Sequence, residues 1–192
     1  MAGGPAVLTL IADPKGLWYL NRASGGVLLV VWTAAIVLGQ LAAVRSARAT
    51  LPRFAWLELH RNLVVVGVFV LVVHVATAVL DDYVDIGVAD VVLPFRTHYQ
   101  PFWLGLGALA ADLAIVIVVT TTLRHRIPRV WAVVHRAAYA LWPLAVGHGV
   151  GIGTDASTVP LSVGSVAVVA AAGGARLLLV ARERNREHRW AP

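Results

Sequence analysis

The chain has 192 residues, of which 59% are hydrophobic and only 14% are charged, and its formal net charge is +6. A soluble domain has roughly one quarter charged residues, so this composition excludes an ordinary soluble protein and indicates a membrane protein. The chain contains no cysteine, which excludes disulfides, thiolate metal sites and covalent haem attachment. The positive charge requires no nucleic-acid partner, because basic loops are typical of proteins embedded in a lipid bilayer.

Five apolar runs follow one another along the chain, and each is close to the roughly 20 residues that a helix needs to cross a bilayer. The sequence therefore predicts an all-α membrane protein, a bundle of five transmembrane helices. No removable signal peptide is expected before the first of them. Because the links are short, residues 1–192 are predicted to form a single transmembrane domain without a second, soluble domain. The expected helices lie near residues 23–44, 59–80, 102–123, 130–150 and 161–181.

Basic and acidic residues collect in different links, and this distribution predicts the orientation. Basic residues resist translocation and stay in cytoplasmic loops. The N-terminus is therefore expected outside and the C-terminus in the cytoplasm, with the protein in a bacterial cytoplasmic membrane. The acidic stretch Asp81, Asp82, Asp85 and Asp90 falls on the outer side. The predicted inner side carries Arg45, Arg48, Arg53, Arg124, Arg126, Arg129, Arg182, Arg184, Arg186 and Arg189.

Four of the seven histidines fall inside two of the predicted helices. His60 and His74 lie fourteen positions apart on the second helix, and His135 and His148 lie thirteen apart on the fourth. Both helices are expected to run from the inside to the outside. The sequence therefore pairs His60 with His135 near the cytoplasmic end and His74 with His148 near the outer end. A rise of about 1.5 Å per residue separates the two levels by about 20 Å.

These two histidine pairs predict a pair of haems. Ionisable residues inside a bilayer are costly and usually functional, and two imidazoles from different helices can bind one haem iron from both axial sides. With both axial positions filled, neither iron would readily bind oxygen, which favours electron transfer. On an ideal helix, thirteen positions miss the starting face by about 140°. We expect Pro143 to bend or rewind the fourth helix, or else the two haems to occupy different grooves beside it.

The two histidine motifs are HRNLVVVGVFVLVVH in the second helix and HRAAYALWPLAVGH in the fourth. With them, the chain resembles the ferric reductase-like transmembrane domain family of ferric reductases, NADPH oxidases and bacterial haem subunits of methionine sulfoxide reductase systems. The resemblance extends from Trp18 to Arg182. It implies an inner b-type haem on His60 and His135, and an outer one on His74 and His148.

The chain departs from this family in two respects. Complete reductases of the family carry a cytosolic flavin and nicotinamide domain after the last helix, and many relatives have a sixth helix before the position of Ala23. The electron donor is therefore expected to be a separate redox partner protein, a quinol, or a small carrier such as a flavin.

Three further charged residues are candidates for the site. Arg61 and Arg136 directly follow the inner histidines. Arginine binds carboxylates bidentately, so both could anchor haem propionates, or they could extend to the cytoplasmic lipid headgroups. Asp112 lies in the middle of the third helix. It could relay protons or contact a quinone, or it could be a neutral carboxylic acid bonded to a neighbouring helix.

The expected function is transmembrane electron transfer through two bis-histidine haems, in a protein whose immediate surroundings are the lipid bilayer. A second interpretation is a quinone-coupled haem subunit of a membrane oxidoreductase, in which Asp112 would help to bind the quinone. A third is a haem-free membrane scaffold or assembly protein whose histidines bond across helices. The sequence leaves the acceptor, the direction of electron flow and the oligomeric state open.

Small and aromatic residues complete the pattern. The stretches 105–110 and 170–175 are rich in glycine and alanine, and they are expected to let neighbouring helices approach closely. Most tryptophans fall near predicted helix ends and are typical of interfacial anchors. Among Trp18, Trp32, Trp56, Trp103 and Trp131, only Trp32 is expected to lie deep.

Overall fold

A computed structural model describes residues 15–42, 52–153 and 158–189, except for the side chains of residues 53 and 183–189. Within these ranges the secondary structure is entirely helical, as predicted. The helices are α2 (Gly16–Ala42), α3 (Arg53–Leu80), α4 (Val88–Val92), α5 (Pro101–Thr122), α6 (Pro128–Arg136), α7 (Ala138–Ile152) and α8 (Thr158–Arg189).

Four of these helices are long and apolar enough to cross a bilayer. They expose large apolar side chains, such as Phe69, which is 70% exposed on α3, and Leu177, which is 72% exposed on α8. Such faces are stable where lipid replaces water, so the structure is consistent with an integral membrane protein. The candidate spans are Gly16–Ala42, Phe54–Leu80, Pro101–Thr122 and Thr158–Arg182.

The prediction of one continuous helix over residues 130–150 is wrong. The chain forms α6 and α7 instead, and the break lies at Ala137. There the amide of Ala137 donates to the carbonyl of Val134, three residues back, at 2.8 Å, so the backbone tightens into a turn. Pro143, inside α7, has no N–H to donate to the carbonyl four residues earlier. Each piece is therefore shorter than the roughly 20 residues of a full span.

The other four predicted helices lie where the sequence places them, with different ends. Helices α2 and α3 begin at Gly16 and Arg53, before the predicted starts, and α8 continues to Arg189. Residues 43 and 44, the predicted end of the first helix, lie outside the described residues, as do Arg45 and Arg48. The side chains of Arg53, Arg184, Arg186 and Arg189 also lie outside the description.

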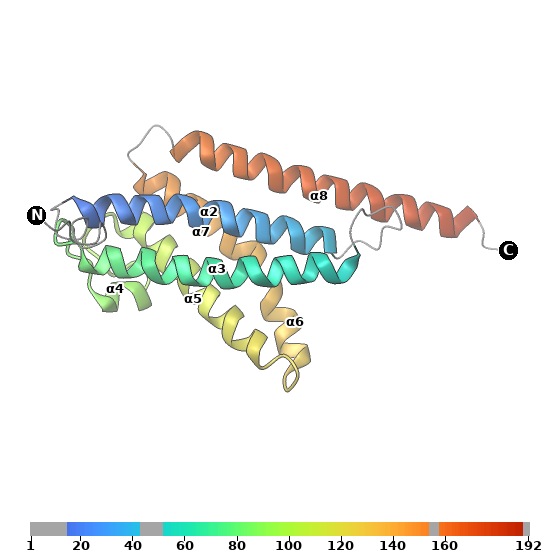
Figure 1. Ribbon diagram of the computed structural model, residues 1–192, viewed down its shortest axis with the longest axis horizontal. Coiled ribbons are helices and arrows are strands. Elements are labelled where there is room, and N and C mark those ends of the chain that lie inside the picture. Colours follow the sequence, from blue (N-terminus) through green and yellow to red (C-terminus); the bar gives the residue numbers. More distant parts are fainter. Residues whose placement is uncertain (1–14, 43–51, 154–157, 190–192) are drawn as a thin grey trace, which may run out of the picture.

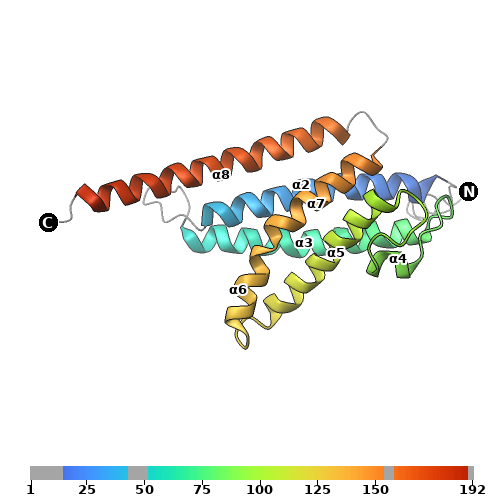
Figure 2. The same cartoon turned by 180° about the vertical axis from the view of Figure 1, so that it is seen from behind.

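Helix α2 occupies the centre of the arrangement. It packs against α3, α7 and α8, whereas α5 packs against α7, α6 and α4. Figure 1 shows α3 and the α6–α7 pair running in the same direction, opposite to α2, α5 and α8. Seen from behind, α6 and the end of α5 diverge from the axis of α3 (Figure 2). The two elements that carry the four histidines are therefore parallel, as the sequence predicts.

Close contacts between α2 and α3 repeat every seven residues, which is about two helical turns. At each contact a glycine of one helix faces a ring of the other. A Cβ atom added to Gly67 would lie only 2.6 Å from Nε1 of Trp32, so only glycine leaves room for the indole. The three facing pairs are Gly25 with His74, Trp32 with Gly67, and Gly39 with His60.

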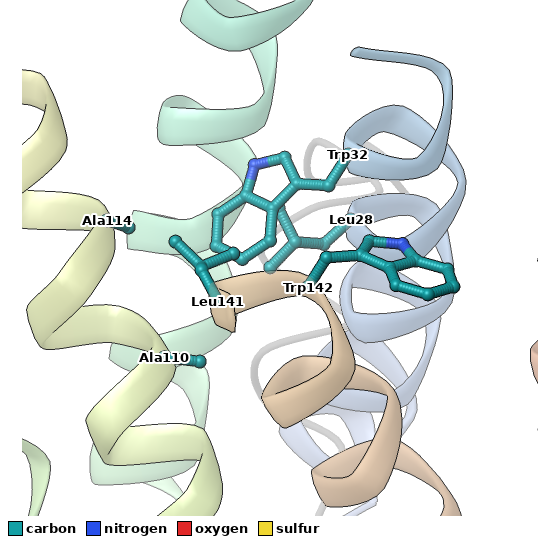
Figure 3. Close-up of a cluster of buried hydrophobic side chains, with 6 residues drawn as sticks. All are labelled: Leu28, Trp32, Ala110, Ala114, Leu141 and Trp142. Carbon is teal, nitrogen blue, oxygen red and sulfur yellow. The ribbon is translucent and has the colours of Figure 1, made fainter. Parts of the chain in front are cut away.

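A buried apolar cluster lies where α2, α5 and α7 meet, beside α3 (Figure 3). Trp32 is buried in this cluster, with 8% of its surface exposed. Trp142 is equally buried, and its Nε1 donates to Oγ1 of Thr33 at 3.0 Å. In the α2–α3 register, Trp32 lies midway between the contacts of His60 and His74, so this core fills the space between the two histidine levels. Its members are Leu28, Trp32, Ala110, Ala114, Leu141 and Trp142.

The first prediction follows from the contact of Gly67 with Trp32. We expect Gly67→Ala to lower the free energy of unfolding by about 1 to 3 kcal/mol, because the new methyl group overpacks a buried indole. The measurement is the thermal unfolding of the purified protein in detergent. Gly164→Ala on α8 is the control, since an added Cβ there meets nothing within 4 Å. Equal melting temperatures for the two variants would contradict the contact.

Candidate functional site: two histidine pairs

The structure brings together the four helical histidines in two pairs. The ring centres of His60 and His135 are 6.2 Å apart, with an interplanar angle of 77°. Those of His74 and His148 are 6.3 Å apart, with an angle of 82°. Each pair joins α3 to the broken α6–α7 element. The turn at Ala137 resets the helical phase between His135 and His148, so both imidazoles face α3 although their spacing does not fit an ideal helix.

At the outer level, backbone carbonyls hold both imidazoles. Nδ1 of His74 donates to the carbonyl of Asn21 at 3.0 Å, and Nδ1 of His148 donates to the carbonyl of Trp103 at 3.0 Å. A carbonyl can only accept, so these bonds place the proton on Nδ1 and leave the lone pair on Nε2. Both outer histidines therefore present Nε2 as a ligand atom.

The inner level is asymmetric. Nδ1 of His60 donates to the carbonyl of Ala35 at 2.8 Å, the same arrangement as at the outer level. Nδ1 of His135, by contrast, is buried and has no hydrogen-bond partner in the described part of the chain. The ring of His135 instead lies against that of Trp131, with ring centres 5.3 Å apart and an angle of 30°. The indole N–H of Trp131 in turn donates to Oγ1 of Thr121 at 3.3 Å.

Three polar side chains in the apolar helices surround His74. Nδ2 of Asn21 donates to the carbonyl of His74 at 2.8 Å and to Oγ1 of Thr77 at 3.3 Å. The hydroxyl of Ser24 donates to the carbonyl of Asn21 at 2.8 Å and lies 3.3 Å from Nδ1 of His74. The sequence analysis missed these residues. The sequence feature that could have predicted them is a polar residue inside an apolar helix, because such a residue needs a hydrogen-bond partner.

Glycines provide the space for three of the imidazoles. Of these, Gly107 lies in the glycine-rich stretch 105–110, whereas Gly25 and Gly39 were not predicted from the sequence. A Cβ atom on Gly25 would lie 3.0 Å from the ring of His74, and one on Gly39 would lie 3.5 Å from that of His60. On α5, a Cβ on Gly107 would lie 2.5 Å from Nδ1 of His148. The available signal is spacing, because Gly25 and Gly39 are separated by the same fourteen positions as the two histidines that they face.

The small residues at 105–110 therefore do admit close neighbours, but these neighbours are rings. Gly107 accommodates His148, and Gly105 accommodates the ring of Phe95, which folds back from the link before α5. In the stretch 170–175, the side chain of Gln40 lies nearest to Gly173, whereas Gly174 faces open space. The first stretch thus contributes to the outer histidine level.

The charged candidates are placed at the edges of the site or outside it. Arg61 is exposed and forms a long ion pair of 3.9 Å with Glu58, one turn earlier on α3. Arg136 is exposed at the end of α6. Asp112 is partly buried on α5, and the structure records no hydrogen bond or ion pair for it among the described residues. A role for any of the three stays a prediction.

The remaining histidines do not join the pairs. His98 and His125 are exposed in the links before and after α5, and the side chain of His188 lies outside the described residues. In the described ranges, no three histidine, aspartate or glutamate side chains gather at one point. Each pair thus offers two imidazole ligands, one from either side of the space between them.

Comparisons with known proteins identify no relative. No family model, no curated protein and no solved structure matches the chain.

A second prediction follows from the contact of Gly107 with His148. In the natural sequence, Gly107→Ala displaces the imidazole, and we expect it to lower the free energy of unfolding by about 1 to 3 kcal/mol. In a His148→Ala background, the same change no longer meets the ring. It is then expected to be neutral, or stabilising by up to about 1 kcal/mol through helix propensity. A double-mutant cycle from thermal unfolding in detergent measures this coupling.

Gly149→Ala, one residue after His148, is the matched control, since an added Cβ there meets nothing within 4 Å. We expect it to leave stability unchanged or raised. A coupling energy near zero between positions 107 and 148 would show that glycine is not required beside the imidazole.

Proposed function

We propose that this protein transfers electrons across a membrane through two b-type haems, each bound between two histidines. His60 and His135 would hold the inner haem, and His74 and His148 the outer one. One observation carries the proposal: four imidazoles, scattered over 89 residues of sequence, form two facing pairs with ring centres 6.2 and 6.3 Å apart.

The spacing of the rings fits one metal ion between each pair. Bonds from imidazole nitrogen to metal are about 2.0 to 2.1 Å long, and a ring nitrogen lies about 1.1 Å from its ring centre. Two imidazoles on opposite sides of one metal ion therefore have ring centres roughly 6.2 to 6.4 Å apart. Both observed distances agree with this value. Two protein ligands are the number that a six-coordinate haem iron needs, because the porphyrin supplies the other four nitrogens.

The orientation of the rings also supports the proposal. Imidazoles that bind metals usually donate the other ring N–H to a carbonyl or carboxylate, which fixes the ring and makes the ligand nitrogen more basic. His60, His74 and His148 have this arrangement, with backbone carbonyls as acceptors at 2.8 to 3.0 Å. Their Nε2 atoms are left as the ligand atoms.

Haem iron that binds two imidazoles can change between its ferric and ferrous states, and it supplies one-electron chemistry. The four histidines would hold the two haems, and their hydrogen bonds to backbone carbonyls would orient three of the imidazoles. The buried cluster around Trp32 and Trp142 lies between the two levels. Arg61 and Arg136, beside the inner histidines, would bind the propionates of the inner haem.

In this proposal the chain spans the membrane five times. Helices α2, α3, α5 and α8 are continuous spans, and α6 and α7 together form a fifth, broken span. Arg124, Arg126 and Arg129 lie around the α5–α6 link, whereas Asp81, Asp82, Asp85 and Asp90 follow α3 at the opposite end of the molecule (Figure 1). By the positive-inside rule, the α5–α6 link faces the cytoplasm of a bacterial cell.

The resemblance to the ferric reductase-like family is part of the same proposal, and it rests on the two histidine motifs. The electron donor would be a separate redox protein or a small carrier. The acceptor would bind at the outer face.

Haem binding is tested by absorption spectra of the detergent-purified protein before and after reduction with dithionite, with haem measured per chain. We expect about two haems per chain with sharp low-spin bands. His74→Ala and His148→Ala should each retain about one haem, because a single remaining imidazole holds the outer haem weakly. His60→Ala should likewise lose the inner haem.

His98→Ala and His125→Ala are the matched controls, since both residues are exposed and belong to neither pair. They should keep the full haem content. A colourless wild-type protein from haem-replete cells would overturn the proposal and favour a membrane scaffold.

The orientation can be tested directly because the natural chain has no cysteine. Single cysteines at Asp85 and His125, in links at opposite ends of the bundle, should react with a membrane-impermeant maleimide from opposite sides of intact cells. Asp85→Cys should be labelled from outside, and His125→Cys only after the cells are opened. Labelling of both from outside would contradict five spans.

A further inference from the structure

The four imidazoles are not held equally. His60, His74 and His148 each donate Nδ1–H to a backbone carbonyl of a neighbouring helix, at 2.8, 3.0 and 3.0 Å. These acceptors belong to the helical backbone, so they cannot rotate away. His135 lacks such an acceptor among the described residues, although its Nδ1 is buried. A ligand without this second bond is less basic and less firmly oriented, and loss of such a bond typically weakens metal binding about 10- to 100-fold.

Trp131 contacts the imidazole of His135 through its ring. Its ring lies against the imidazole of His135 at 5.3 Å between centres, four residues away on the same helix. The position of the indole is set in turn by Thr121 on α5, whose hydroxyl oxygen accepts its N–H at 3.3 Å. A stacked ring restricts the tilt of the imidazole, but it accepts no proton from Nδ1. Trp131 is therefore a positioning residue for His135.

His135 also lies on a sparsely packed helix. None of the residues of α6 is buried, and Val130 and Val133 are 52% and 62% exposed. The helix ends one residue after His135, at the turn of Ala137. In Figures 1 and 2, α6 and the end of α5 project away from α3. Segments with few buried contacts open at a lower free-energy cost than the core of a protein.

From this asymmetry we infer that His135 is the exchangeable ligand of the inner haem: on the ferrous iron, a small neutral ligand of the carbon monoxide class would take its place, in contrast to the expectation that neither iron readily binds such ligands. The inference rests on the proposed haem assignment. In this exchange Nε2 of His135 would leave the iron and the ligand would bind in its place, with no transfer of an electron or a proton. His60 stays bound on the other side. The outer site, with both imidazoles bonded to carbonyls, does not exchange.

The test uses carbon monoxide on the dithionite-reduced, detergent-purified full chain, followed by the change in the haem absorption bands. Wild type should bind about one carbon monoxide per two haems. Two double variants locate the site. His74→Ala with His148→Ala keeps only the inner pair and should still bind carbon monoxide. His60→Ala with His135→Ala keeps only the outer pair and should stay six-coordinate and unreactive.

Single variants then test the positioning role of Trp131. Trp131→Leu should raise the affinity for carbon monoxide about tenfold or more, because it releases His135. Thr121→Val keeps the size of the side chain and removes only the acceptor of the indole N–H, so a smaller increase is expected. Trp56→Leu is the matched control: Trp56 is also partly buried, lies toward the same end of the molecule, and has no recorded ring contact with a histidine.

The outcomes separate this inference from the haem proposal itself. A protein with two low-spin haems and no carbon monoxide binding would overturn the inference and leave the haem proposal intact. Binding by the outer-only variant but not by the inner-only variant would also overturn it. If Trp131→Leu and Trp56→Leu had equal affinities for carbon monoxide, Trp131 would not be a positioning residue for His135. A colourless protein would overturn both proposals.

Discussion

The register of α2 against α3 is the constraint on which the rest of the structure depends. At successive seven-residue steps, a glycine of one helix faces a ring of the other, so the backbones approach while large side chains stay between them. Without a hydrophobic driving force between helices in lipid, such close packing and a few hydrogen bonds hold a membrane bundle together. The same register sets both histidines of α3 at defined depths and places Trp32 between them.

The second constraint is the cost of an unpaired N–H in an apolar medium. Three imidazoles meet it with backbone carbonyls, which also fixes the nitrogen that each presents to the other helix. Nδ1 of His135 has no such acceptor among the described residues, and this one difference distinguishes the inner level from the outer. The inner and outer levels therefore differ although both consist of histidines. The difference is whether a backbone carbonyl accepts the Nδ1–H of each imidazole.

The length of the apolar runs and the direction of the helices account for most of the fold and for the candidate pairs. The long apolar runs predict α2, α3, α5 and α8, and the parallel direction of the second and fourth runs pairs His60 with His135 and His74 with His148. The apolar residues of the stretch 130–150 predict one continuous helix and do not reveal the turn at Ala137, because a backbone hydrogen bond between residues three apart requires no particular side chains. The glycines opposite the rings are equally hard to find, since a glycine in an apolar helix has several possible uses.

The sequence by itself indicated a lipid environment, and it determined the helical class and the spacing of the histidines along their helices, because these follow from composition and from the fixed rise per residue. Only the tertiary structure decided which way each imidazole faces and which atoms bond its second nitrogen. These properties depend on the carbonyls of Asn21, Ala35 and Trp103, which lie on other helices. Backbone carbonyls are the same in every residue, so no pattern of side chains could reveal which of them would accept these bonds.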